Sequence, residues 1–287
     1  MQEQKTDPAL LRYVAFSADP AGGNPAGVVL DATGFDEPAM AATAAEVGFS
    51  ETAFVVPQDD GTLRIRYFSP RTEVPFCGHA TIATAVAYAE RHGVGELRLR
   101  TKAGLVHVST DRTPDGRVVA TLESVPTRMA PVPEDALAAL LDALRWPAAD
   151  LDPALPPRAA YAGAWHPVIA AGTRERLAAL DYDMPALAAL MARHDWATVD
   201  LVWRETPVVF HARNPFPPGG VVEDPATGAA AAALGGYLRE LRLVPLPARV
   251  TVHQGYDMGR PSTIEVGIPA QRAGGVTVTG TAVPLPG

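Results

Sequence analysis

Two stretches of small apolar residues constrain this 287-residue chain more than any other feature. The first, "CGHATIATAVAYAE", covers residues 77–90, and the second, "TGAAAAALGGYLRE", covers residues 227–240. When Gly78 is aligned with Gly228, the same alignment pairs the glutamates at the far ends. A proline-containing irregular segment precedes each stretch, and strand-like residues follow it. The chain is therefore predicted to consist of two similar halves.

Both stretches are apolar nearly all round, which predicts helices that are buried on every side. A sheet can close around such a helix only if the helix is thin, and alanine and glycine make it thin. We therefore expect an α+β fold of two pseudo-symmetric halves, each a mostly antiparallel, curled sheet around a central apolar helix. Short strands with few intervening helices argue against a doubly wound parallel sheet.

Apolar periodicity and turn residues predict the remaining elements and the domain boundaries. The proline- and alanine-rich segment 124–158 separates an N-terminal half, 1–123, from a C-terminal half, 124–274. A last strand, at about 275–287, is expected to return to the first half, and the active site is expected in the cleft between the halves. Helices are predicted at 36–47, 80–91, 133–145 and 184–194, and strands at 13–16, 26–30, 52–56, 63–68, 96–101, 106–110, 117–122, 161–171, 201–212, 249–253, 263–266 and 276–279.

Charge and composition exclude several classes of function. A formal net charge of -8 disfavours binding to a nucleic-acid backbone, which needs clustered lysine and arginine. The single cysteine, Cys77, allows no intrachain disulfide and gives no sign of an oxidising compartment. No run of about 18 apolar residues predicts a membrane span, and the N-terminus lacks the pattern of a signal peptide. The expectation is a soluble, cytoplasmic protein without nucleic-acid or membrane partners.

Asp224 directly precedes Pro225 and has two interpretations. In the first, it is the N-cap of the second helix, with Pro225 at the first helical position. In the second, it faces a cleft and orients a substrate or another side chain. Its neighbour Glu223 is expected to point the other way, as a solvated or structural residue.

His79 and Glu51 are candidates for proton transfer. His79 lies at the start of the first helix, where the helix dipole favours the neutral imidazole that can accept or donate a proton. A structural histidine is the alternative. Glu51 lies in "GFSETAF", and a glutamate in apolar surroundings can act as a general base and then as a general acid. An exposed strand residue is the alternative for Glu51.

Cys77 is a candidate nucleophile or proton-transfer thiolate at a helix start. Its counterpart in the second stretch is Thr227, which argues against a symmetric mechanism with two thiols. No second histidine lies at metal-ligand spacing from His79, so no metal site is predicted. The glycines of "GGNPAG" are not followed by a helical pattern, which excludes a phosphate-binding loop.

Five motifs, in order along most of the chain, resemble the phenazine-biosynthesis PhzF-like family. They are "GNPAGVV" from residue 23, "GFSETAFV" from 48, "RYFSPRTEVPFCGHAT" from 66, "EDPATGAAAAAL" from 223 and "HQGYDMGRPS" from 253. The resemblance implies the diaminopimelate-epimerase-like fold, which agrees with the internal repeat. It also implies an enzyme without cofactor or metal, usually a homodimer.

The resemblance implies roles for individual residues. The glutamate of the "SET" motif is the general acid and base, which corresponds to Glu51 in this chain. His79 and Asp224 correspond to residues that hold and polarise the substrate. Backbone N–H groups at the two helix starts are expected to bind a substrate carboxylate. The expected substrate-binding positions are Ser50, Gly78, Gly228 and Ala229.

The founding activity of the family is isomerisation of trans-2,3-dihydro-3-hydroxyanthranilate, in which one carboxylate removes a ring proton and returns it elsewhere. The expected partner is therefore a small carboxylate-bearing substrate of this kind. The family often has a serine after "EDPATG", where this chain has Ala229, so a hydroxyl that could bind substrate is missing.

Two alternatives stay open. One is an amino-acid racemase or epimerase on the same fold, which would use paired cysteines at the two helix starts. The other is a non-catalytic small-ligand-binding protein, which predicts that Glu51, His79 and Asp224 do not converge.

Overall fold

The computed structural model describes residues 10–271 and 273–286, which divide into two compact units. Unit 1 takes the residues up to Leu122 and those from Gly280 on, and unit 2 is Glu123–Thr279. Most of the N-terminal segment considered for a signal peptide lies outside the described residues. Within the described part of the chain, no helix combines the length and the apolar character needed to cross a membrane.

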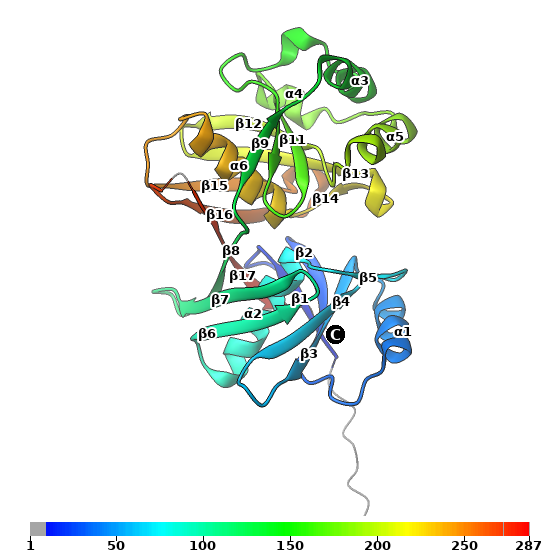
Figure 1. The fold of residues 1–287 in the computed structure, drawn as a ribbon, viewed down its shortest axis with the longest axis vertical. Helices are drawn as coiled ribbons and strands as arrows, with labels where there is room; N and C mark the ends of the chain where they lie inside the picture. The colour runs from blue at the N-terminus through cyan, green and yellow to red at the C-terminus, as the bar shows by residue number, and fades with distance from the viewer. Residues whose placement is uncertain (1–9, 272, 287) are drawn as a thin grey trace, which may run out of the picture. The chain divides into compact units, whose positions relative to one another are not determined.

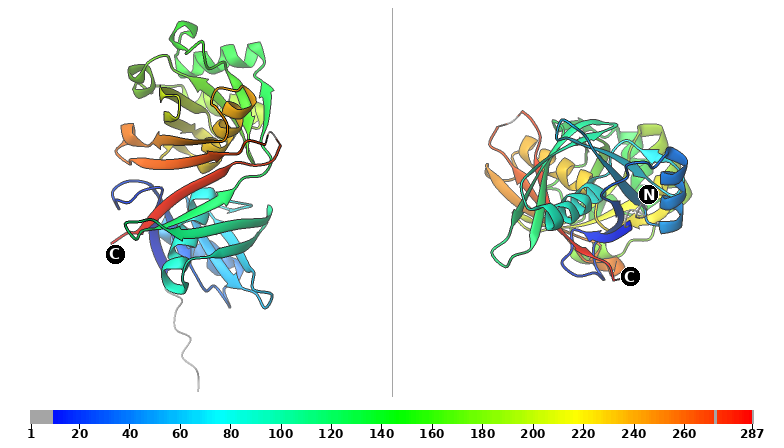
Figure 2. Two further views of the ribbon diagram at one scale, coloured as in Figure 1. Left: turned by 90° about the vertical axis from the view of Figure 1, so that its left-hand side faces the viewer. Right: turned by 90° about the horizontal axis from the view of Figure 1, so that it is seen from below.

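Unit 1 is a curled sheet with one helix inside it and one outside (Figure 1). The inner helix, α2, spans Gly78–His92, and every residue from His79 to Ala87 is buried. It contacts β1, β2, β3 and β7, and both views in Figure 2 show strands of unit 1 curling around it. The strands are β1 (Leu10–Ala15), β2 (Asn24–Val29), β3 (Glu51–Pro57), β4 (Leu63–Phe68), β5 (Glu73–Val74), β6 (Glu96–Thr101), β7 (Gly104–Arg112) and β8 (Val118–Glu123).

The outer helix of unit 1, α1 (Glu37–Val47), covers the other face of the sheet. Asp36 caps it by accepting a hydrogen bond from the backbone N–H of Ala39, and Gly48 ends it with a left-handed φ of 70°. The buried side of α1 joins an apolar cluster with residues of β2, β3 and β4. The helix predicted at 36–47 is therefore confirmed.

Unit 2 has the same plan around α6 (Gly228–Glu240), which is buried from Ala230 to Arg239 and contacts β9, β10, β11 and β16 (Figure 1). The outer helices are α3 (Glu134–Leu144), α4 (Arg174–Ala178) and α5 (Met184–His194), which bury an apolar cluster against the sheet. The strands are β9 (Arg128–Pro131), β10 (Arg158–Tyr161), β11 (Trp165–Ala170), β12 (Asp200–Thr206), β13 (Val209–Phe216), β14 (Val221–Asp224), β15 (Ala248–Gln254), β16 (Ser262–Ile268) and β17 (Thr277–Pro284), which ends in unit 1. Short 3₁₀ helices lie at Ala148–Asp150, Pro217–Gly219 and Tyr256–Met258.

Each inner helix connects two parallel strands of its own sheet. α2 joins β4 to β6, and α6 joins β13 to β15. Parallel pairs also join β2 to β3 and β11 to β12, and the other registers described are antiparallel. Parallel neighbours need a crossover connection, and the inner helices supply it. Both helices begin at the glycines aligned in the sequence, Gly78 and Gly228, which confirms the internal repeat.

Close packing requires glycine in the middle of α6. A Cβ atom on Gly235 would lie 2.7 Å from Cγ1 of Val266 on β16, and one on Gly236 would lie 2.6 Å from Cβ of Thr127. Carbon atoms in contact are normally about 3.5–4.0 Å apart, so a side chain at either position would have to displace its neighbour. The expectation that small residues let the sheet approach its inner helix is confirmed for α6.

Several strands are longer than their apolar patterns predict. β7 covers Gly104–Arg112 instead of 106–110, and β17 covers Thr277–Pro284 instead of 276–279. β2 begins at Asn24 instead of residue 26, inside the segment expected to be a loop. Backbone pairing with a neighbouring strand decides where these strands end, and the partner strand is not visible in a local pattern.

A chain of buried polar groups runs through the core of unit 2. Thr198 Oγ1 donates to Asn214 Oδ1 at 2.6 Å, so the hydrogen bond of 2.8 Å between His166 Nδ1 and Thr198 Oγ1 has the imidazole as donor. Asn214 Nδ2 then donates to Asp200 Oδ1 at 3.1 Å. Burial lowers the pKa of His166 to about 4 and raises the pKa of Asp200 to about 7. Both end groups are therefore neutral over the range between these values.

Replacement of Gly235 by alanine is expected to destabilise unit 2 by about 1–2 kcal/mol, because overpacking against Val266 outweighs the better helix propensity of alanine. Chemical unfolding followed by tryptophan fluorescence measures this, since all four tryptophans lie in unit 2. The double variant Gly235→Ala, Val266→Ala should be more stable than the sum of the single effects by at least about 0.5 kcal/mol. Strict additivity of the two effects would contradict the packing argument.

The buried pair also predicts a pH dependence. The unfolded chain binds more protons at His166 between pH 4 and 6.5, so this group loses stability as the pH falls. The folded chain binds more protons at Asp200 between pH 3.8 and about 7, so this group loses stability as the pH rises. The two effects oppose one another in the wild type.

Single variants should reveal how each group changes the stability with pH. Relative to wild type, Asp200→Asn should lose stability as the pH falls from about 7 to 4, and His166→Asn should lose it as the pH rises from about 4 to 6.5, each by up to about 3–4 kcal/mol. Unfolding in urea at several pH values measures both. Parallel pH profiles for the two variants would show that neither group titrates as described.

Candidate active site

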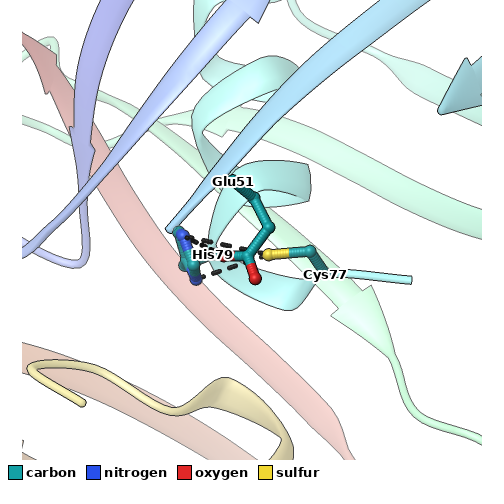
Figure 3. Close-up of side chains that lie close together, drawn as sticks. All are labelled: Glu51, Cys77 and His79. Carbon is teal, nitrogen blue, oxygen red and sulfur yellow. Dashed lines mark hydrogen bonds and ion pairs between the residues drawn. The ribbon is translucent and has the colours of Figure 1, made fainter. Parts of the chain in front are cut away.

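Three side chains with acid–base chemistry meet at the start of α2 in unit 1 (Figure 3). Glu51, the first residue of β3, places Oε2 3.4 Å from Nε2 of His79. The thiol of Cys77 lies 3.4 Å from Nδ1 and 3.8 Å from Nε2 of the same imidazole. The side chains of Glu51 and His79 are only 17% and 8% exposed. The carboxylate and the imidazole are thus held together in a largely desolvated place.

The hydrogen bonds of His79 determine which of its nitrogen atoms carries the proton. Asn24 Nδ2 lies 3.3 Å from Nδ1, and an amide nitrogen can only donate, so Nδ1 accepts. The proton of the neutral ring is therefore on Nε2, which faces the Glu51 carboxylate and lies 3.3 Å from Ser50 Oγ. In this form the imidazole presents an N–H to the carboxylate.

Sheet register and a buried brace put these residues in place. β2 and β3 pair in parallel, with Ala26 opposite Glu51, so the start of each strand lies at the same edge of the sheet. At the helix start, Thr81 Oγ1 donates to the carbonyl of Cys77 at 2.6 Å and makes a hydrogen bond of 2.7 Å with the hydroxyl of Tyr67. Burial holds the pKa of Tyr67 well above its usual range, so this hydroxyl stays protonated. These two hydrogen bonds therefore fix the first turn of α2 to β4.

In unit 2, Asp224 is tied to the start of α6 by hydrogen bonds. Thr227 Oγ1 donates to Asp224 Oδ2 at 2.6 Å. Gln254 accepts from the backbone N–H of Thr227 at 3.0 Å and donates to the carbonyl of Asp224 at 2.7 Å. The N-cap interpretation of Asp224 is wrong: Asp224 is the last residue of β14, Thr227 is the N-cap, and Pro225 lies before the helix. Strand pairing with β13 holds Asp224 outside the helix.

The motif "HQGYDMGRPS" supports this loop. Ser262 Oγ donates to the carbonyl of Pro225 at 3.0 Å. Gly255 has a φ of 78°, and a Cβ atom there would lie 2.3 Å from the carbonyl oxygen of Arg260. The chain can therefore turn here only with glycine. The role of this motif in the fold is therefore to position the loop that carries Asp224.

Glu223, expected to be solvated or structural, is structural. Its carboxylate is buried and binds Arg213 through two hydrogen bonds, one of them 2.9 Å long from Nε. The solvated interpretation is wrong because β13 places a guanidinium opposite it, and no local pattern reveals that partner. Arg213 also donates to the carbonyl of Ala178 at the end of α4.

The predicted site residues thus fall into two groups. Ser50, Glu51, Gly78 and His79 lie together at the start of α2 in unit 1. Asp224, Gly228 and Ala229 lie at the start of α6 in unit 2. The convergence of the two groups on one substrate stays a prediction. Two contributors were missed by the sequence analysis, which quoted their motifs without a role: Asn24 and Gln254.

Comparison with known proteins identifies the family of this chain. A family model described as phenazine biosynthesis-like protein matches residues 13–286. An Escherichia coli K12 protein named uncharacterized isomerase YddE is 33% identical over 286 residues, with 97% of this chain and 96% of that protein covered. The trans-2,3-dihydro-3-hydroxyanthranilate isomerase of Pseudomonas aeruginosa is 34% identical over 261 residues, with 88% of each chain covered.

Among solved structures, a phenazine biosynthesis protein of the PhzF family from Bacillus anthracis superposes with a TM-score of 0.85. The sequence identity is 26%, and 96% of each chain is covered. This likeness confirms the fold class predicted from the sequence.

The neighbouring acids Glu223 and Asp224 are expected to respond differently to loss of charge. Glu223→Gln leaves the buried Arg213 without its counter-ion and should destabilise unit 2 by about 3–5 kcal/mol. Asp224→Asn keeps an acceptor for Thr227 and should cost about 1 kcal/mol or less. Tryptophan-monitored unfolding at neutral pH compares the stability of the two variants. Equal losses of unfolding free energy would contradict the structural role assigned to the Glu223–Arg213 pair.

Proposed function

This chain belongs to the phenazine biosynthesis-like protein family and is an isomerase, and we propose that it moves a proton within a small carboxylate-bearing substrate, with Glu51 carrying the proton. The contact that supports this most is the one between the Glu51 carboxylate and His79 Nε2. A carboxylate close to an N–H donor in a partly desolvated place can accept a proton and return it. The proposed reaction requires no redox step.

In the proposed reaction, Glu51 removes a proton from a substrate carbon, and the electron pair of that C–H bond moves into the conjugated system of the substrate. Glu51, now a carboxylic acid, gives the same proton to another carbon on the same face. The number of protons and electrons in the substrate is unchanged. His79 orients the carboxylate through Nε2–H, and Asn24, with Nδ2 3.3 Å from Nδ1, donates to the imidazole in that tautomer.

The start of α2 suits the substrate carboxylate. The first backbone N–H groups of a helix have no partner within the helix, and the side chain of the N-cap residue, Cys77, makes no capping hydrogen bond to them. A Cβ atom on Gly78 would meet no heavy atom within 4 Å, so there is room beside this turn. Packing therefore does not require glycine at position 78. The open space beside it can admit an anion.

Asp224, Gly228 and Ala229 are proposed to complete the site from unit 2. The named activity of the Pseudomonas aeruginosa relative suggests a substrate similar to trans-2,3-dihydro-3-hydroxyanthranilate. Ala229 offers no hydroxyl at the start of α6, so the group that a serine would bind must be recognised otherwise or be absent from the substrate. The family resemblance further suggests a cytoplasmic homodimer, and light scattering coupled to size exclusion tests the assembly.

An epimerase with two thiols is disfavoured by the residue at the start of α6. The position equivalent to Cys77 is Thr227, whose hydroxyl donates to Asp224 at 2.6 Å. A threonine hydroxyl is a far weaker acid than a thiol and does not serve as its counterpart in proton exchange. The racemase alternative would therefore need a second base of another kind.

Glu51→Gln is expected to lower kcat by at least about 100-fold, because the amide cannot take up the substrate proton. Turnover of trans-2,3-dihydro-3-hydroxyanthranilate and of related small carboxylates measures the effect, and a thermal shift with the same compounds checks that binding persists. Glu96→Gln is the matched control, because Glu96 also opens a strand of unit 1 but is exposed. Full activity of the Glu51 variant would rule out Glu51 as the proton carrier.

Turnover in heavy water distinguishes one base from two. A single carboxylate that returns the proton it removed should give only partial deuterium incorporation into the product. Complete incorporation with inversion at the reacting carbon would instead indicate an epimerase with two bases. Mass spectrometry of the product after one turnover measures the incorporated deuterium.

A further inference from the structure

Glu51, Cys77 and His79 together make a set of donors that proton transfer alone does not require. Each offers one ligand atom, and these atoms all lie within 4.8 Å of one another (Figure 3). We propose that the three side chains form a binding site for Zn²⁺ and that the bound ion blocks the proton transfer. The binding itself is independent of the proposed function, and only the inhibition rests on it.

The distances suit one small ion. A tetrahedral Zn²⁺ with bonds of about 2.0–2.3 Å places its ligand atoms roughly 3.3–3.6 Å apart. In unit 1, Nε2 of His79 lies 3.4 Å from Oε2 of Glu51 and 3.8 Å from Sγ of Cys77. All three ligand atoms lie within 4.8 Å of one another, so side-chain rotations must bring Sγ and the carboxylate oxygen closer together to surround an ion. A three-ligand site of this kind leaves a fourth position for water.

The donor types select the ion. Sulfur is a soft ligand, which favours Zn²⁺ over Mg²⁺ or Ca²⁺, and imidazole has the same preference. The thiolate and the carboxylate together neutralise the double charge of the ion, so no unpaired charge is buried. A thiolate is also favoured at the start of α2, where the helix dipole stabilises negative charge.

Protons are accounted for when the ion binds. The S–H bond of Cys77 breaks, its electron pair forms the S–Zn bond, and the proton leaves to solvent. The proton of His79 moves from Nε2 to Nδ1, so that Nε2 can bind the ion. The side-chain amide of Asn24, 1% exposed and 3.3 Å from Nδ1, can turn to accept this proton through Oδ1. Asn24 thus supports either state of the imidazole.

The sequence criterion for metal sites missed this set because it looked for a second histidine near His79 along the chain. The carboxylate instead comes from β3, and the parallel pairing of β2 and β3 brings it to the start of α2. Occupation by Zn²⁺ would engage the Glu51 carboxylate that is proposed to take the substrate proton. The metal-bound form is therefore inactive, and a chelator restores activity.

Cobalt is the probe for this site. Reduced, EDTA-treated protein is titrated with Co²⁺, and the thiolate-to-cobalt charge-transfer band in the near ultraviolet and the visible bands of a tetrahedral ion are recorded. The wild type should bind one Co²⁺ per chain with both signals, and added Zn²⁺ should remove them. Absence of a charge-transfer band in the wild type overturns the proposal.

Variants assign the ligands. Cys77→Ala and Cys77→Ser should lose the charge-transfer band, and His79→Gln should weaken binding by at least about tenfold. His92→Ala is the matched control, because it removes an exposed imidazole from the other end of α2 and should leave both signals unchanged. Circular dichroism confirms the fold of each variant. Visible bands of a tetrahedral cobalt ion that persist unchanged in Cys77→Ala would show that the metal binds elsewhere and would also overturn the proposal.

Inhibition is measured separately. The rate of each protein with Zn²⁺ is expressed relative to its own rate in EDTA, and Cys77→Ser should need at least about tenfold more Zn²⁺ for half inhibition than the wild type. Equal inhibition of both proteins would contradict the regulatory role of this site. A wild type that shows the cobalt signals but turns over no candidate substrate supports the metal site and refutes the proposed function.

Discussion

Enclosure of one thin helix by the curled sheet of each unit is the constraint on which the other features depend. A helix inside a sheet must let strands approach its backbone, and Gly235 does so by leaving room for Val266. The same enclosure makes the helix the crossover between two parallel strands, because no other segment can pass through the interior. The first turn of the helix then lies at the edge of the sheet, where β2 and β3 also begin in unit 1.

The two units use this common plan for different chemistry. In unit 1 the helix start is surrounded by groups that exchange protons or bind metals: Glu51, Cys77 and His79. At the aligned positions of unit 2, Thr227 replaces the thiol and Ala229 replaces the imidazole. The hydroxyl of Thr227 is already hydrogen-bonded to Asp224, so the start of α6 carries a fixed acceptor but no thiol and imidazole of the kind found at the start of α2. The internal repeat therefore explains the fold. The chemistry depends on the positions at which the two helix starts differ.

The local sequence pattern predicts the buried helices and part of the candidate site, but not the residues whose roles depend on distant partners. Burial on all sides is visible in the sequence of α2 and α6, and the motifs around Glu51 and His79 carry the family resemblance. The roles of Asn24 and Gln254 were not predicted, because the function of a side-chain amide depends on a hydrogen-bond partner that lies far away in the sequence. The N-cap interpretation of Asp224 and the solvated interpretation of Glu223 are wrong for a related reason: β14 is defined by its pairing with β13, and a four-residue strand has too little periodicity to be told from a helix start.

Proton transfer and metal binding make the same demand on a side chain, namely an accessible lone pair held close to a second donor. Glu51 and His79 meet that demand, with Oε2 and Nε2 3.4 Å apart. The same two side chains can therefore transfer a proton or bind a metal ion. Two such donors bind a divalent ion weakly, and a third donor of soft character changes the balance. In unit 1 that third donor is Cys77, the one cysteine of the chain. A single thiol beside the carboxylate and the imidazole therefore makes the proposed isomerase site sensitive to zinc, whereas a residue without sulfur at that position would leave a site for protons alone.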